Sequence, residues 1–164
     1  MARKTTEAQP EAEAKTDTDI FARIKADHDT IRSLLDRTEE ANGSGRAVFE
    51  DLQRELWAHS KVEEGVFYAS LKKAKEARSE TIEGLNEHHL INGLLDELNA
   101  MKTTDSGWKE KLQVLGELVR HHLDEEEDEL FEQARDVLDD GRAAELGSLY
   151  ADRKGHMMAG LAPL

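Results

Sequence analysis

A chain of 164 residues with a net charge of −14 is long enough for one domain with one hydrophobic core. The negative charge makes nucleic acid and anionic membrane surfaces poor partners, and no apolar run is long enough to span a membrane. The sequence has no cysteine, which excludes disulfides and thiolate metal sites and fits a reducing, cytoplasmic location. Because the two prolines lie near the ends and the interior is rich in Ala, Leu, Glu, Lys and Arg, we predict an all-helical protein.

Periodicity divides the chain into a tail, a bundle and a C-terminal segment. Residues 1–17 are polar and low in complexity, so we expect a disordered N-terminal tail. Residues 18–138 predict an up-down-up-down four-helix bundle, because short loops join long helices. The four expected helices cover 18–40, 46–75, 79–102 and 108–138. In the last segment, 139–164, "DDG" ends the fourth helix and a short fifth helix is expected at about 142–156.

The second half of the bundle repeats the first half. "DHDTIRSLLDR" aligns with "EHHLINGLLDE", which places His28 over His88. "HSKVEEGVFY" aligns with "HLDEEEDELF", which places His59 over His122. A bundle built from two such halves has an approximate two-fold axis through its core.

Each expected helix carries one histidine on its apolar stripe. An α-helix turns about 100° per residue, so residues three or four apart share a face. By this rule the histidines align with Ile, Leu or Val, and the second and fourth helices add a glutamate one turn later. The polar residues predicted to face inward are His28, His59, Glu63, His88, His122 and Glu126.

These residues are also expected at one depth of the bundle. His28 and His59 are equally far along the chain from the loop at 42–45, and the other two histidines are equally far from the loop at 103–107. A single core histidine usually only packs. Two buried carboxylates, however, are costly unless they are protonated or neutralised. A metal cluster therefore explains the combination better than packing does.

Imidazole and carboxylate ligands together suit iron, manganese or zinc. No histidine follows a glutamate by three residues, so the Glu-x-x-His motif of ferritin-like di-iron bundles is absent. The His-Glu-x-x-His motif of metalloproteases is absent as well. A zinc-bound or metal-free structural bundle is the alternative to a redox-active site.

Four stretches resemble the helices of hemerythrin-like proteins, the HHE cation-binding domain family: "DHDTIRSLLD", "HSKVEEGVFYASL", "EHHLINGLLDEL" and "HHLDEEEDELFEQAR". "LGSLYADRKGHM" is similar to the fifth helix of bacterial members. The resemblance implies a centre of two non-haem iron ions with an oxo or hydroxo bridge and two bridging carboxylates. Carried over motif by motif, the implied ligands are His28, His59, Glu63, His88, His122 and Glu126.

The sequence differs from the oxygen-carrying hemerythrins at two ligand positions. Those proteins have a second histidine one turn after the ligand of the third helix, where this chain has Asn92. Their fourth helix carries His-x-x-x-x-Asp, where this chain has Glu126 four residues after His122. The differences favour the bacterial branch, whose members are associated with oxygen or nitric oxide sensing, peroxide removal and repair of iron centres.

The resemblance predicts a di-iron protein that takes a peroxide or a small diatomic molecule as ligand. Its leading function is catalase-like peroxide decomposition in oxidative or nitrosative stress defence. The alternative is oxygen or nitric oxide binding or sensing without turnover. We expect a monomer or a weak homodimer.

Other polar residues near the motifs are expected to lie outside the ligand set. We interpret Asp27 and Glu87 as solvated, with orientation of the neighbouring histidines as the alternative, and Tyr68 as a core residue, with a position at the site as its alternative. The acidic run at 124–129 is expected to face water, with Glu126 as its inward exception.

The remaining histidines are interpreted as peripheral. His89 and His121 lie about 100° from their inward neighbours, so we expect them at the surface or behind the ligands. His156, with Met157 and Met158, is expected on the fifth helix as part of a lid or a partner surface.

Overall fold

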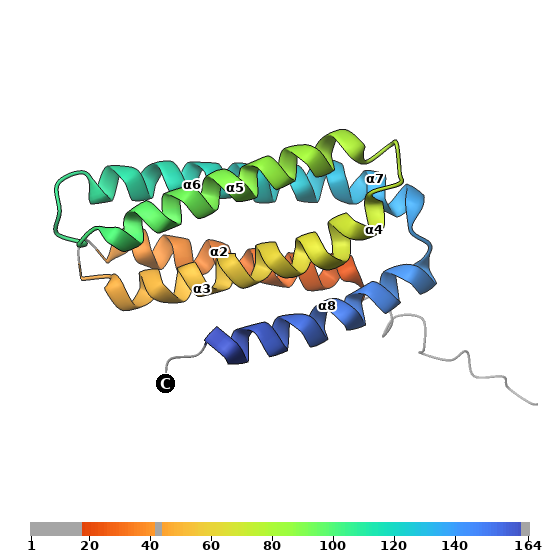
Figure 1. Cartoon of the computed structure of the whole chain (residues 1–164), viewed down its shortest axis with the longest axis horizontal. Coiled ribbons are helices and arrows are strands. Elements are labelled where there is room, and N and C mark those ends of the chain that lie inside the picture. The colour runs from red at the N-terminus through yellow and green to blue at the C-terminus, as the bar shows by residue number, and fades with distance from the viewer. Residues whose placement is uncertain (1–17, 42–43, 162–164) are drawn as a thin grey trace, which may run out of the picture.

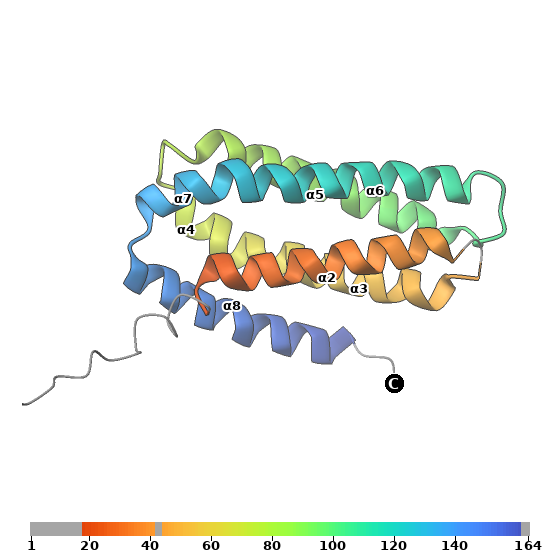
Figure 2. The same cartoon turned by 180° about the vertical axis from the view of Figure 1, so that it is seen from behind.

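The computed structural model describes residues 18–41 and 44–161, over which every regular element is a helix (Figure 1). The elements are α2 (Ile20–Glu40), α3 (Arg46–Glu63), η1 (Glu64–Tyr68), α4 (Ala69–Leu71), α5 (Arg78–Ala100), α6 (Trp108–Glu125), η2 (Glu126–Leu130), α7 (Phe131–Val137) and α8 (Asp140–Leu161). The stretches α2, α3–α4, α5 and α6–α7 alternate in direction, and α8 lies against α2 and α3 (Figures 1 and 2). The predicted all-α up-down-up-down bundle with a fifth helix is confirmed. The expected disordered tail at 1–17 lies outside the described residues.

Two of the long helical stretches contain a wider, π-helical turn at equivalent places in the repeat. η1 follows directly after Glu63, and η2 begins at Glu126. In such turns the backbone hydrogen bonds span five residues instead of four, and they occur frequently at functional sites. The periodicity predicted uninterrupted helices over 46–75 and 108–138, because a five-residue π-turn leaves almost no trace in an apolar pattern.

The fifth helix is longer than the predicted 142–156. α8 has 22 residues, and "DDG" at 139–141 starts it instead of only ending the previous helix. Leu138 breaks the helix with extended backbone angles, φ −99° and ψ 122°. The Asp139 carboxylate then accepts a hydrogen bond from the backbone N–H of Arg142 at 2.7 Å, which is the chemistry of a helix N-cap.

A polar layer divides the core into two apolar clusters. In one cluster the rings of Phe21, Phe67 and Phe131 meet edge to face, with centroids 5.2 to 5.9 Å apart. In the other, the rings of Phe49 and Trp108 have centroids 5.8 Å apart. Because apolar side chains cover the layer on both sides, its polar groups are removed from water.

Within residues 18–41 and 44–161, none of the helices combines the length and the apolar composition that crossing a membrane requires.

α8 approaches the backbone just before α2 closely at Gly147. A Cβ at this position would overlap the carbonyl oxygen of Thr18 and lie 2.6 Å from the carbonyl carbon of Asp19. Both neighbours are backbone atoms at the beginning of α2, so they cannot rotate away. The absence of a side chain at Gly147 therefore sets the distance between α8 and the bundle.

We predict that Gly147→Ala destabilises the fold by about 1–3 kcal/mol, the usual cost of overpacking. The matched control is Gly155→Ala on the same helix, where a Cβ meets nothing within 4 Å. That change should be neutral or stabilising by roughly 0.5–1 kcal/mol, because alanine favours helix over glycine. Thermal unfolding followed by circular dichroism measures both. Equal melting temperatures for the two variants would contradict the close approach of α8.

Candidate metal centre

The six residues predicted to face inward lie together in the polar layer, and each is at most 3% exposed. α2 and α5 each supply one histidine, while α3 and the α6–η2 stretch each supply a histidine and a glutamate. The residues are His28, His59, Glu63, His88, His122 and Glu126. Their inward orientation is confirmed, and their role as metal ligands stays a prediction.

Glu63 lies between histidines of two different helices. Its Oε2 is 2.8 Å from Nε2 of His59, one turn earlier on α3, and 3.5 Å from Nε2 of His88 on α5. The carboxylate therefore connects neighbouring helices at the centre of the bundle.

Glu126 repeats this arrangement in the other half. Its Oε2 is 3.4 Å from Nε2 of His122 and 3.9 Å from Nε2 of His28. The Nε2 atoms of His88 and His122 are 3.0 Å apart, and one ligand atom each of Glu63, His88 and His122 lie within 4.8 Å of one another. The four imidazoles thus turn Nε2 toward two carboxylates, in the two-fold pattern that the repeat predicts.

Several atoms of this layer have no hydrogen-bond partner among the described residues. They are both carboxylate oxygens of Glu63 and of Glu126, and Nε2 of His28 and of His59. The short approach of His59 to Glu63 lacks the alignment of a hydrogen bond. An unpaired buried polar atom costs roughly 1–3 kcal/mol, and more when it is charged. Convergent carboxylate oxygens and imidazole nitrogens are a donor set for iron, manganese or zinc, so these residues fit a metal.

The opposite ring nitrogen, Nδ1, of each histidine faces an acidic side chain on a neighbouring helix. The pairs are His28 with Glu127 at 2.7 Å, His59 with Asp27 at 3.4 Å, His88 with Glu64 at 2.9 Å, and His122 with Glu87 at 3.4 Å. Metal-binding histidines almost always donate this second N–H to a carboxylate or a carbonyl. The contact orients the ring and turns Nε2 toward the centre.

Sequence reasoning missed these four acids. The expectation that Asp27 and Glu87 are solvated is wrong, because Glu87 is 8% exposed and the Asp27 side chain 18%. In the run at 124–129, Glu127 is a further inward exception. The repeat contains the signal that finds them. Asp27 and Glu87 occupy equivalent positions in the two halves, and so do Glu64 and Glu127.

Tyr150 of α8 adds a second contact to one histidine of the centre. Its hydroxyl oxygen is 2.9 Å from Nδ1 of His59, and the hydroxyl donates to Asp27. Lys154 donates to Asp27 at 2.8 Å and also to Glu55. Burial alone would raise the pKa of Asp27, but His59 and Lys154 lower this pKa to about 2. α8 therefore supports the centre from outside the four-helix bundle.

Comparison with known proteins decides the family. Residues 19–134 match the Hemerythrin family, described as the Hemerythrin HHE cation binding domain. The chain belongs to this family. A solved structure of a Hemerythrin HHE cation binding domain-containing protein from Mycobacterium kansasii shares the fold, with a TM-score of 0.78, 23% identity, and coverage of 87% of this chain and 88% of that one. A DNA nickase from Nostoc sp. (strain PCC 7120) is 25% identical over 126 residues, which cover 76% of this chain but only 36% of the nickase.

The two glutamates of the polar layer, Glu63 and Glu126, differ in the direction of their pKa shifts when no metal is bound. Burial and the charge of Glu63 raise the pKa of Glu126 well above its usual range. Burial opposes the ionisation of Glu63, but His59 holds the pKa of Glu63 well below its usual range. Burial likewise opposes the charging of His59, yet Glu63 and Asp27 raise its pKa to about 9. These shifts favour an ionised Glu63 beside a charged His59 and a protonated Glu126.

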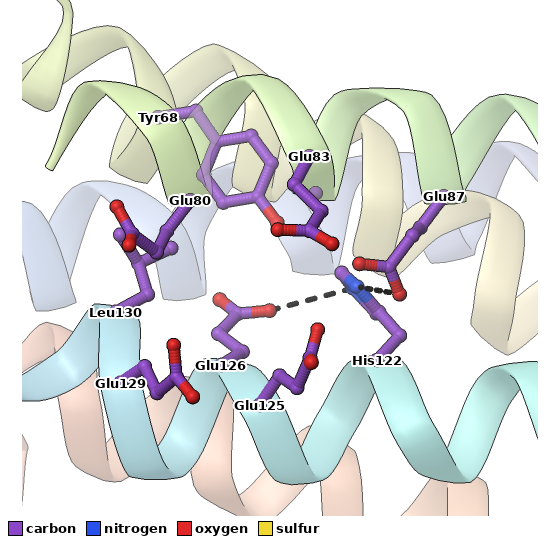
Figure 3. Close-up of a pocket in the computed structure, with 10 residues that line it drawn as sticks. Tyr68, Glu80, Glu83, Glu87, His122, Glu125, Glu126, Glu129 and Leu130 are labelled. Atoms are coloured by element: carbon purple, nitrogen blue, oxygen red, sulfur yellow. Dashed lines mark ion pairs between the residues drawn. The ribbon is translucent and has the colours of Figure 1, made fainter.

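Tyr68 is both a packing residue and a lining residue of the site. Its ring stacks on His88, with centroids 5.4 Å apart and planes at 13°. Its buried hydroxyl has no hydrogen-bond partner among the described residues and points into a cavity beside Glu126 and His122 (Figure 3). A Cβ at Gly84 would lie 2.9 Å from the ring carbon that carries this hydroxyl, so glycine makes room for the tyrosine. Tyr68 is therefore a core residue, as expected, and its hydroxyl also lines the site.

The remaining histidines lie at the periphery of the HHE domain. His89 and His121 are exposed, as predicted. His156 is exposed on α8, while Met157 packs against the apolar cluster around Phe21. Whether this part of α8 acts as a lid or a partner surface stays a prediction.

We predict that Glu126→Gln does not destabilise the metal-free protein at pH 8, because it replaces a carboxylate that is costly to ionise there. The folded-state pKa of Glu126 is raised above the unfolded value of 4.5. Its contribution to stability is therefore fully present below pH 4.5 and is lost as pH rises through the folded pKa.

The measurement is the melting temperature of metal-free wild type and Glu126→Gln between pH 5 and 8. The wild type should lose stability relative to the variant as pH rises. With iron added, the wild type should gain more than the variant, because a bound ligand stabilises only the state that binds it. If Glu126→Gln melts several degrees below the wild type at pH 8 without metal, the ionisation of Glu126 does not destabilise the metal-free fold and the prediction is wrong.

Proposed function

We propose that the polar layer binds two iron ions, with His28, His59, Glu63, His88, His122 and Glu126 as the protein ligands. The observation that carries this proposal is the set of buried, unpaired carboxylate oxygens facing four imidazoles. Membership of a cation-binding family supports a metal, and this donor set suits iron. Six ligand residues in two equivalent halves are more than a single reactive ion needs from the protein, because such an ion keeps a position open for solvent or substrate.

We further propose that the centre reacts with a small oxidant and that its leading activity is decomposition of hydrogen peroxide. Bound iron would supply redox chemistry and Lewis acidity. In this reaction two molecules of peroxide give one of oxygen and two of water, so no outside reductant is needed. The apolar clusters on both sides of the layer exclude bulky reductants. The Tyr68 hydroxyl is free to donate a hydrogen bond to a small molecule in the cavity beside Glu126.

The position of Asn92 supports turnover over reversible oxygen carriage. Asn92 stands where the oxygen carriers have a further histidine, and it lines a separate cavity with Trp57 and His89. α5 therefore places one imidazole in the layer, that of His88. Six residues leave more positions open on two metal ions than a larger ligand set does, which favours reaction with an oxidant.

A sensing role is the second candidate, and α8 favours it. Tyr150 of α8 contacts His59 directly, which provides a path by which a change at that imidazole would reach a helix outside the bundle. Sensing requires that ligation shifts α8 between two arrangements with different contacts. Peroxide turnover separates the two candidates. The net charge of −14 opposes approach to DNA and therefore disfavours a nicking activity for this chain.

We predict that His122→Ala loses most of the iron and that His121→Ala retains two ions per chain at saturation. The two histidines are adjacent, but only His122 faces Glu126, while His121 is exposed. Iron content by elemental analysis, together with the near-ultraviolet and visible spectrum, measures the difference. Loss of iron in the His121 variant with retention in the His122 variant would show that the wrong histidine has been assigned.

For the reaction, we predict that the ferric wild type evolves oxygen from peroxide and that Glu63→Ala abolishes this activity. Glu63 joins α3 to α5 at the centre, so its removal takes a ligand from the layer. The control is Glu117→Gln, an exposed change on α6. An oxygen electrode measures the rates. Rapid reversible oxygen binding by wild type, without peroxide turnover, would replace the proposed activity by a carrier or sensor function.

A further inference from the structure

One cavity opens from the surface between α5 and the α6–η2 stretch and reaches the polar layer. Six glutamates line it. Glu126 lies at its inner end, and the other five are Glu80, Glu83 and Glu87 from α5, with Glu125 and Glu129 from the opposite stretch. We call the five glutamates other than Glu126 the acidic mouth. No lysine or arginine occurs among the described residues that line the cavity. Figure 3 shows the glutamates on both sides of the opening.

The inner end of this cavity is formed by buried groups that lack partners. The Glu126 side chain is 2% exposed, lines the cavity and has no hydrogen-bond partner for either oxygen among the described residues. The unpaired Tyr68 hydroxyl points into the same space (Figure 3). The acidic mouth therefore leads inward to the carboxylate oxygens of Glu126 and the hydroxyl of Tyr68, which have no hydrogen-bond partner among the described residues.

A separate set of ligand atoms lies at the mouth. Glu87, His121 and Glu125 each place one such atom within 4.8 Å of the others. His121 and Glu125 are accessible from outside, with Nε2 and Oε1 3.2 Å apart, whereas Glu87 is buried. Glu87 also contacts Nδ1 of His122 at 3.4 Å. This outer cluster thus reaches from solvent to a histidine of the centre.

The size and charge of the opening limit what can pass. The cavity leaves ≈ 20 Å³ for the centres of water-sized molecules, which is room for about one water. A fully hydrated cation does not fit, but carboxylate and imidazole groups can replace its waters one at a time. Clefts lined by one sign of charge concentrate counter-ions and raise their association rates about 10- to 10³-fold. The acidic mouth therefore attracts divalent cations and repels anions.

We propose that the acidic mouth is the route by which ferrous iron reaches the buried layer, and that Glu87, His121 and Glu125 form an exchangeable divalent-cation site on this route. The route rests on the proposed metal centre. The outer site is a binding site of its own, with one imidazole and two carboxylates as ligands.

The first test is the rate of ferrous iron uptake by metal-free protein under anaerobic conditions. Glu83→Gln/Glu129→Gln removes two charges from the mouth without touching the six buried residues or the three residues of the outer site. The matched control, Glu110→Gln/Glu117→Gln, removes two charges from exposed positions of α6 outside the cavity. Uptake should slow about tenfold in the mouth variant, with final iron content unchanged, and change less than about twofold in the control.

The second test measures Mn²⁺ binding to the iron-loaded protein by electron paramagnetic resonance. The wild type and the Glu110→Gln/Glu117→Gln control should bind one weakly held Mn²⁺, which His121→Ala should lose. Equal uptake rates in the two double variants overturn the route, while unchanged Mn²⁺ binding by His121→Ala overturns the outer site. Failure of the wild type to take up iron at all overturns the metal centre, and the route with it. Full iron content with unaltered rates leaves the centre standing and removes only the route.

Discussion

The rest of the structure depends on two buried carboxylates, of which the protein supplies a charged partner for only one. Glu63 and Glu126 lie in a layer sealed above and below by apolar clusters, where an ionised carboxylate loses its hydration. In the metal-free state one of them pairs with His59 and the other stays protonated. The proposed metal would resolve this conflict, because its positive charge would take the place of the proton and neutralise both carboxylates.

The acidic side chains around the polar layer fix the orientation of its four histidines. Each imidazole is held at Nδ1 by a carboxylate from another helix, so the four histidines are oriented before any metal arrives. The π-turns that start beside Glu63 and Glu126 occur at equivalent places in both halves. α8 extends this support through Tyr150, and Gly147 lets that helix approach closely enough to do so. The contacts that hold α8 and the helices of the bundle together therefore also fix the positions of the histidines.

The inward set was predictable because each of its six residues lies in line with aliphatic residues on a regular helix. His28 follows Ile24 by one turn and precedes Ile31, so its direction is contained in local periodicity alone. The acids that orient the rings were not predictable in this way. Glu87 lies about 100° off the stripe of α5, and only its length and the position of α6 bring it to His122. The contact of Tyr150 with His59 depends on how α8 packs against the bundle, which the periodicity of the sequence does not indicate.

The most direct test of the central claim is a crystal structure of the iron-loaded protein, with anomalous scattering recorded at the iron absorption edge. The account predicts two strong iron peaks per chain in the buried layer, both within bonding distance of Glu63 and Glu126, with His28, His59, His88 and His122 completing the protein ligands. A single peak, or iron found only outside this layer, would contradict it.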